Sequence, residues 1–324
     1  MVYPAMKATV MLEPNHFTVL SQNIVKALLY FDLFNYPLKT EEVYCNLQTN
    51  HVTRAELARE LKELTAAKVL YQSGEYFSMQ SSYDLILRRI TGNRKAEEHM
   101  RIAERRARWI YQFPFVRAVM ISGSLSKHYA DDQTDIDFFI ITARRRLWVA
   151  RTLLVLFKRI FLLNSHKFFC VNYFIDEEHL EIEEKNLFTA TELSTLLPMH
   201  GSDLYHRFVG CNSWVREILP HAQEKTVMGG HGHDSNSWLK RSLEFALDTG
   251  TGTWLEKMFM GLTQLRWRRR YKRALSPEDF QIAFKSKGYV SKNHPDNFQR
   301  RVMDRYQEKL EEFATRHCLR WTYD

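Results

Sequence analysis

The first eighty residues alternate between apolar and polar positions with the period of short helices. Three such segments follow one another, at residues 19–34, 40–47 and 53–68. In the third segment, Thr53 and Glu56 have the spacing of a capping box. Its apolar residues recur on one helical face, at Leu57, Leu61 and Leu64. We therefore predict three consecutive helices, the third of which begins at Thr53 and buries its leucine face.

A hairpin is predicted directly after these helices. Residues 69–79 form two short apolar runs around a turn at Ser73 and Gly74. This order of elements resembles a winged helix, and in DNA-binding members of that class the third helix enters the major groove. Here the basic residues of that helix are offset by three glutamates, so its charge is close to balanced. The sequence leaves open both DNA binding and a structural or protein-docking role.

The segment with the clearest candidate catalytic residues comes after a long, charged helical pattern over residues 82–113. Residues 116–142 have the pattern of an apolar strand, a Gly-Ser turn, a short polar helix and a second apolar strand. Gly123 lets backbone approach a phosphate, and Ser124 offers a hydroxyl beside the amides of the next helical turn, which attract anions. Lys127 adds positive charge. We therefore predict a phosphate-binding turn at Gly123, Ser124 and Lys127.

Two aspartates open the second strand of this segment. Asp135 and Asp137 are two positions apart, so we expect both carboxylates on one face of the strand and Ile136 in the core. Paired carboxylates suit Mg²⁺, which prefers oxygen ligands and takes further contacts from substrate phosphates. The sequence therefore predicts a Mg²⁺ site at Asp135 and Asp137.

The Gly-Ser turn followed by Asp-x-Asp on the next strand resembles the signature of the DNA polymerase β-like nucleotidyltransferase superfamily, over about residues 95–200. The chain also resembles uncharacterised bacterial nucleotidyltransferase-domain proteins through its NYF and LFTATEL runs. These resemblances imply that Gly123 and Ser124 bind the phosphates of a nucleoside triphosphate. They also imply that Asp135 and Asp137 hold catalytic metal.

Catalytic members of that superfamily usually carry a third aspartate on a neighbouring strand. The strand expected here, KFFCVNYFI, has Asn172 near its middle, with Cys170 and Phe174 expected on the same face. We predict a catalytic-pocket position for Asn172, although an amide is a poor general base, and a half-buried asparagine bonded to backbone is the alternative. Acidic substitutes stand nearby at Asp176, Glu181 and Glu183. We expect the last two, in HLEIEE, on the return strand of a hairpin.

Cations in the C-terminal third offer further phosphate contacts. Lys285 and Lys287, with Lys292, are predicted to fold back over a triphosphate, with plain solvation as the alternative. The basic run at 266–273 is interleaved with aromatic residues, which fits either nucleic-acid binding or a solvated helix face. The glycine-rich segment containing His231, His233 and Asp234 is interpreted as a flexible loop rather than a metal site.

Composition narrows the partners and the compartment. The 324 residues, 45% of them hydrophobic, indicate an ordinary globular protein of about two or three domains, and the net charge of +8 favours anionic partners. Four distant cysteines without a CxxC pair indicate neither zinc nor disulfides, so we expect a cytoplasmic protein.

The apolar stretch 147–163 contains three cations, which predicts an amphipathic helix packed on a sheet, and we expect no membrane partner. Walker A, GxSxG and HExxH motifs are absent, which argues against the commonest ATPases, hydrolases and metalloproteases.

These patterns predict an α+β protein in three parts. We expect a winged-helix-like domain at 1–90, a nucleotidyltransferase domain with a small mixed sheet at 91–200 and a helical domain at 201–324. The predicted function is Mg²⁺-dependent transfer of a nucleoside monophosphate to an unidentified hydroxyl of RNA, protein or a small molecule. Two alternatives stay open: an inactive nucleotide-sensing or DNA-binding regulator that keeps this fold, and a protein-interaction scaffold. The sequence does not indicate the oligomeric state.

Overall fold

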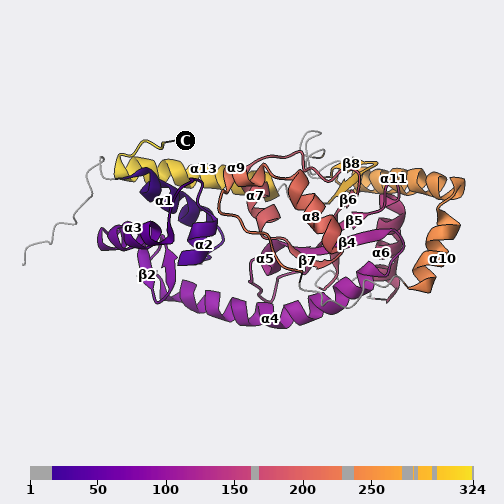
Figure 1. Cartoon of the computed structure of the whole chain (residues 1–324), viewed down its shortest axis with the longest axis horizontal. Coiled ribbons are helices and arrows are strands. Elements are labelled where there is room, and N and C mark those ends of the chain that lie inside the picture. The colour runs from indigo at the N-terminus through magenta and orange to yellow at the C-terminus, as the bar shows by residue number, and fades with distance from the viewer. Residues whose placement is uncertain are drawn as a thin grey trace, which may run out of the picture. The chain divides into compact units, whose positions relative to one another are not determined.

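The computed structural model of the chain describes residues 17–161, 168–227, 237–271, 280, 284–293 and 298–322. Its fold is mixed α+β with two open sheets, in agreement with the predicted fold class at that level. The chain divides into two compact units (Figure 1). The first unit comprises residues 1–89, 216–222 and 300–324, and the second comprises 90–215 and 223–299.

Three helices and a three-stranded sheet form most of the first unit. They are α1 (Val19–Asp32), β1 (Leu38–Lys39), α2 (Thr40–Cys45), α3 (Arg54–Ala66), β2 (Tyr71–Ser73) and β3 (Tyr76–Ser78), with strand order β1-β3-β2. The predicted capping box is present, because the Thr53 hydroxyl accepts from the Glu56 N–H and the Glu56 carboxylate accepts from the Thr53 N–H. The leucine face of α3 is buried. The three predicted helices and the hairpin are therefore confirmed.

The last helix of the chain, α13 (Phe298–His317), completes the first unit with most of its length. Its Tyr306 hydroxyl donates to the carbonyl of Lys26 in α1, at 3.2 Å. Phe313 packs edge-on against Phe17, with ring centroids 5.9 Å apart. No local sequence pattern predicts this pairing of the two ends of the chain.

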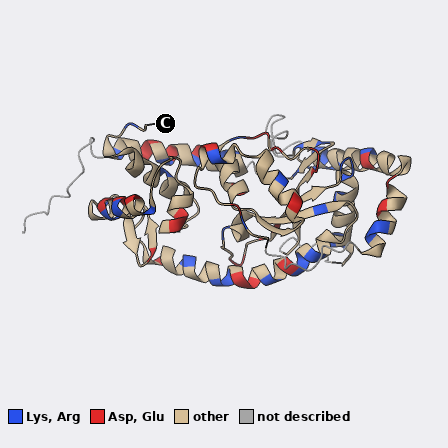
Figure 2. Ribbon diagram, viewed as in Figure 1, with Lys and Arg blue, Asp and Glu red and all other residues tan. Residues whose placement is uncertain are grey.

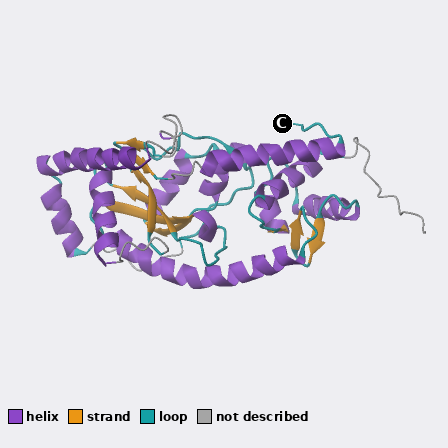
Figure 3. Ribbon diagram, turned by 180° about the vertical axis from the view of Figure 1, so that it is seen from behind, coloured by secondary structure: helices purple, strands orange, loops and turns teal. Residues whose placement is uncertain are grey.

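The second unit is built on a six-stranded sheet. Its strands are β4 (Val116–Ser122), β5 (Asp137–Thr142), β6 (Cys170–Asp176), β7 (Leu197–His200), β8 (Ser286–Lys287) and β9 (Val290–Lys292). Their order is β7-β4-β5-β6-β9-β8, and only β5 and β6 are parallel neighbours, so the sheet is mixed. The strands are drawn in orange among the helices in Figure 3. A parallel pair needs a crossover, and α6 (Leu147–Phe161) provides it.

Helices cover both faces of this sheet. The remaining helices of the second unit are α4 (Tyr83–Tyr111), which enters it at Ile90, α5 (Gly123–Ser126), α7 (Leu187–Ser194), α8 (Ser202–Cys211), α10 (Trp238–Leu247) and α11 (Gly250–Tyr271), whereas α9 (Val215–Ile218) belongs to the first unit from Arg216 onward. Phe138 belongs to the core that β5 shares with α4 and α6, whereas Phe139 points the other way and contacts Phe208 of α8. The amphipathic helix predicted at 147–163 is confirmed over Leu147–Phe161, because its apolar face, with Leu147 and Leu154, lies in this core. In the described ranges, no helix combines the length and apolar character that crossing a membrane requires.

Helix α4 confirms the long charged helix predicted before the first strand of the sheet. Its alanines at Ala96, Ala103 and Ala107 are fully buried against the sheet. Charges of both signs follow its other sides (Figure 2). Small residues on the inner face let the helix lie close to the strands, so that the chain leaves α4 next to the start of β4.

The return strand predicted at HLEIEE is wrong. Residues 177–186 contain turns and bends but no strand, and the neighbours of β6 are β5 and β9. Because β9 occupies the edge of β6 that a return strand would need, this segment packs elsewhere. The Asn212 side chain accepts from the Ile182 N–H at 2.9 Å and donates to the Leu180 carbonyl at 2.8 Å. These bonds replace the ladder that a hairpin would have made.

Candidate functional site

The turn at Gly123 packs directly against an aspartate. Strand β4 ends at Ser122, which pairs with Asp137 on β5, and the chain then turns into α5 with Gly123 at φ +69°. A Cβ at Gly123 would lie 2.6 Å from Oδ2 of Asp137. Glycine therefore serves both the left-handed backbone and the close approach to the carboxylate. Ser124, the next residue, is exposed at the same turn.

Asp135 and Asp137 lie at the opening of β5, although the strand itself begins only at Asp137. Ile136 between them is fully buried in the core, as predicted, and both aspartates are half-buried. The pKa of Asp137 is raised to about 7, mainly because burial disfavours the charged carboxylate. The negative charges of Asp135 and Glu192 raise that pKa further. A bound cation would relieve this accumulation of negative charge.

The side chain of Asn172 lies beside this carboxylate. Its side-chain amide donates to Cys170 Sγ at 2.8 Å and to Asp137 Oδ1 at 3.5 Å. The Cys170 thiol also hydrogen-bonds Asp137, and burial raises the pKa of that thiol. Asn172 therefore offers a hydrogen-bond donor to Asp137 from the strand next to β5.

A register shift in β6 explains how Asn172 is placed. Phe138 pairs with Val171 but Phe139 pairs with Tyr173, so Asn172 is an extra residue in its strand. Phe174 consequently lies in the core with Val171 instead of sharing a face with Cys170. The predicted shared face of Cys170 and Phe174 is thus wrong, because simple alternation does not survive a bulge.

Lys127 lies beside the turn but is engaged in an ion pair. Its Nζ is 2.8 Å from Glu192 Oε1 on α7 and donates to the Gly123 carbonyl at 3.2 Å. Glu192 is not among the site residues predicted from the sequence, although it lies in the LFTATEL run. That run and the NYF run each bring one polar side chain, Glu192 and Asn172, to the surroundings of Asp137.

Lys158 of α6 is a second side chain that the sequence analysis did not assign to the site. It is buried, which lowers the pKa of its ammonium group, while the nearby Cys170 thiol and Asp135 carboxylate oppose that shift. The only signal in the sequence was a cation within an apolar helix. Such a cation argues against a membrane span but does not by itself indicate a site.

Lys285 and Lys287 do not contact the two aspartates. Strand β8 lies three places from β5 in the sheet, and Lys285 pairs with Glu183 and Glu184 at 2.9 and 3.0 Å. Lys287 pairs with Glu183 at 3.0 Å, and these lysines hold the pKa of Glu183 down at about 2. Lys292, the other loop lysine, donates to Gln299 at 3.1 Å.

The other acidic substitutes also lie apart from Asp137. Asp176 bonds the His179 ring at 2.7 Å, and Glu181 pairs with Lys185 at 2.7 Å. The histidine-containing loop with His231, His233 and Asp234 lies outside the described residues. So do Lys272 and Arg273 of the basic run, of which Arg266, Arg268, Arg269 and Arg270 are exposed on α11.

The arrangement at Asp137 suits a cation shared with a phosphate. Within the described ranges, no three His, Cys, Asp or Glu side chains are grouped to hold a metal ion. Mg²⁺ commonly takes only one or two carboxylates and completes its coordination with water and substrate phosphates, so Asp135 and Asp137 fit it on that basis. Comparison with protein families, with curated proteins and with solved structures gives no match to this chain. Its function is therefore inferred from the site alone.

Proposed function

We propose that the second unit is a Mg²⁺-dependent nucleotidyltransferase with the polymerase β-like fold. The observation that carries this proposal is the contact between the Gly123 turn and the Asp137 carboxylate, with Asp135 beside it. A backbone turn that presents amides, packed on paired carboxylates, places a triphosphate next to the ion that would neutralise it. The substrate is a nucleoside triphosphate, and the acceptor is a hydroxyl of RNA, protein or a small molecule.

In the proposed reaction the acceptor hydroxyl attacks the α-phosphorus, the bond to the β-phosphate oxygen breaks, and pyrophosphate leaves. The turn at Gly123 and Ser124 orients the phosphates for in-line attack. Mg²⁺ held by Asp135 and Asp137 would supply charge neutralisation on the reacting phosphates. The hydroxyl proton needs an acceptor, and Asp135 and Glu192 are the carboxylates near Asp137 that can take it.

Asn172 favours a second candidate, a nucleotide-sensing regulator that keeps this fold without turnover. Its amide donates toward Asp137 and cannot serve as a general base. A sensor would still bind nucleotide through the turn.

We propose a winged-helix fold for the first unit, supported by its helix order and by the strand order β1-β3-β2. The exposed side of α3 carries Arg54, Arg59 and Lys62 together with Glu56 and Glu63. Arg54 forms an ion pair with Glu41 at 2.6 Å, so its charge is partly neutralised and less available to a DNA phosphate. This charge balance favours a docking role over DNA binding for α3.

The test is incubation of the purified protein with each α-labelled nucleoside triphosphate and Mg²⁺, with cell extract as the source of acceptor. We expect label to move to RNA, protein or a small molecule with the wild type and not with Asp135→Asn or Asp137→Asn. Asp132→Asn is the matched control, because this exposed carboxylate in the same loop pairs with Lys95 and should leave transfer unchanged.

Thermal shift with nucleotide and Mg²⁺ separates the two candidates. If nucleotide stabilises the wild type but no labelled product forms, the protein is a nucleotide sensor and not a transferase. No stabilisation and no label would reject nucleotide binding and leave the scaffold alternative.

A further inference from the structure

Helix α10 is attached to its unit by charged side chains. Lys240, only 2% exposed, donates to the backbone carbonyls of Tyr111 at 2.7 Å and Val116 at 2.8 Å. Glu244, one turn further along, accepts from the Phe115 N–H at 2.6 Å. Helices on protein surfaces normally bury their apolar face, so α10 has the reverse arrangement. Its apolar side is left facing outward.

The outward side of α10 carries two aromatic residues in line. Trp238 and Phe245 are seven positions apart, which is close to two helical turns, and they are 76% and 85% exposed. Helix α11 adds Trp254, which is 62% exposed. Further exposed apolar side chains on these two helices are Leu239, Leu243, Leu262 and Leu265. Single exposed apolar residues are ordinary, but a gathering of this kind on consecutive helices marks an interaction surface.

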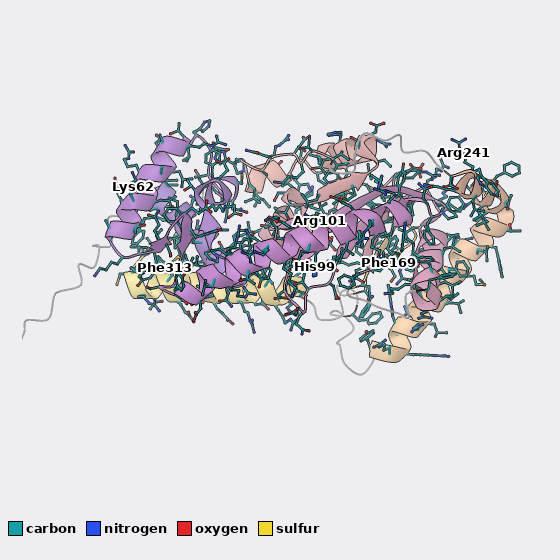
Figure 4. The ribbon with its side chains drawn as sticks, turned by 90° about the horizontal axis from the view of Figure 1, so that it is seen from below. Lys62, His99, Arg101, Phe169, Arg241 and Phe313 are labelled. Atoms are coloured by element: carbon teal, nitrogen blue, oxygen red, sulfur yellow. The ribbon has the colours of Figure 1, made fainter. Side chains whose placement is uncertain are left out.

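The charges on the same two helices select an anionic partner. Their acids are all engaged within the unit, Glu244 by Arg117 at 2.7 Å, Asp248 by Arg146 at 2.9 Å and Glu256 by the N–H groups of Trp148 and Val149 at 2.8 and 2.9 Å. Their exposed cations are Arg241, Lys257, Arg266, Arg268, Arg269 and Arg270. Arg241 lies on the outer side of α10 in Figure 4. The net charge that α10 and α11 present outward is therefore positive.

We propose that the exposed side of α10 and α11 docks on the surface of an anionic lipid bilayer. Outward tryptophan, phenylalanine and leucine side chains next to arginines are the composition of helices that lie in the lipid interface, where headgroups attract the cations. No described helix spans a membrane, so the attachment is peripheral. This departs from the sequence-based expectation of no membrane partner, which rested on the lack of a spanning segment.

Two other occupants fit the same surface less well. A second copy docked symmetrically would bring the cations of one copy against those of the other. Single-stranded nucleic acid would use the arginines and the aromatic rings, but the exposed leucines offer nothing on which a base can stack. A lipid interface uses all three kinds of side chain.

The test is co-sedimentation of the full chain with two kinds of vesicle, one of phosphatidylcholine alone and one with about a quarter phosphatidylglycerol. We expect binding to the anionic vesicles that weakens as salt is raised, and little binding to the neutral ones. The double variant Trp238→Ser, Phe245→Ser and the charge reversal Arg241→Glu should each weaken binding about tenfold or more. Because these side chains are exposed, the variants should fold like the wild type.

Matched controls use exposed residues of the first unit. Tyr83→Ser removes an exposed aromatic ring and Lys62→Glu reverses an exposed charge, and both should bind vesicles like the wild type. Equal binding by wild type and α10 variants, or none to anionic vesicles, overturns the proposal. It is also overturned if a labelled RNA binds and vesicles do not, or if the α10 variants abolish a dimer detected by sedimentation.

Discussion

The surroundings of the Asp137 side chain disfavour its charged, deprotonated form. Burial and the nearby charges of Asp135 and Glu192 raise its pKa from an ordinary value near 4 to about 7. Between those two values the folded state binds more protons at this group than the unfolded state does. The free energy of unfolding therefore falls as the pH rises through that window. Functional sites often carry such a local loss of stability.

Replacing Asp137 by asparagine should remove this penalty. We expect Asp137→Asn to be more stable than the wild type at about pH 8, by an order of 2–4 kcal/mol, and to differ little from it near pH 4. Thermal unfolding of both proteins across the pH range measures the difference. A wild type that is as stable as Asp137→Asn at the higher pH would contradict the raised pKa.

The Gly123 turn gives a second test at the scale of one residue. Gly123→Ala places a Cβ against Asp137 Oδ2 in a left-handed backbone, so we expect a loss of about 2–3 kcal/mol. Gly74→Ala is the matched control, because Gly74 has φ +60° with no atom near its Cβ position, and it should lose only about 1 kcal/mol. Urea unfolding compares them. Equal losses would mean that backbone strain, and not the contact with Asp137, explains the glycine.

At the scale of elements, α10 depends on one buried cation. Lys240→Met removes the donor to the carbonyls of Tyr111 and Val116, so we expect α10 to lose about 1–3 kcal/mol of local stability. Hydrogen exchange over residues 237–248 should then become faster. Arg241→Met, the exposed neighbour, should leave exchange unchanged. Unchanged protection in Lys240→Met would show that other contacts hold the helix.

Elements whose signals are local were predicted well from the sequence. The capping box at Thr53 fixed the start of α3, and the apolar run 116–122 gave the bounds of β4. Elements that depend on a partner were missed. The short strand β9 is defined by pairing to β6 and the two-residue strand β8 by pairing to β9, which no local pattern reveals. The bulge at Asn172 is likewise visible only in the register of β5 and β6.

At the scale of the whole molecule, the two ends of the chain stabilise the same unit. Phe313 is buried against Phe17 and Trp321, so Phe313→Ala should destabilise the first unit by about 3–5 kcal/mol. We expect faster hydrogen exchange in α1 and little change in β4 and β5. Glu312→Ala, at the exposed neighbouring position of the same helix, is the control. Equal effects in both units would show that the loss of stability is not confined to the first unit.

Sequence patterns could not predict that α13 packs on α1, because nothing in residues 298–317 identifies α1 as the partner. The candidate site was more accessible to sequence analysis. Gly123 and Asp137, fourteen positions apart, were brought together as the strand, turn and strand pattern implied. Glu192 and Lys158 were not foreseen as neighbours of the aspartates, because α7 and α6 approach them only through the packing of the sheet. Local motifs thus indicated the centre of the site but not its periphery.

Electron paramagnetic resonance of Mn²⁺, used in place of Mg²⁺, tests the central claim most directly. The titration is made with an equimolar mixture of the four nucleoside triphosphates, on the wild type and on Asp137→Asn. The account predicts Mn²⁺ held by the wild type in the presence of nucleotide, with the affinity reduced about tenfold or more in the variant. Equal Mn²⁺ binding by the two proteins, or none by the wild type, would contradict a metal–nucleotide site at Asp135 and Asp137.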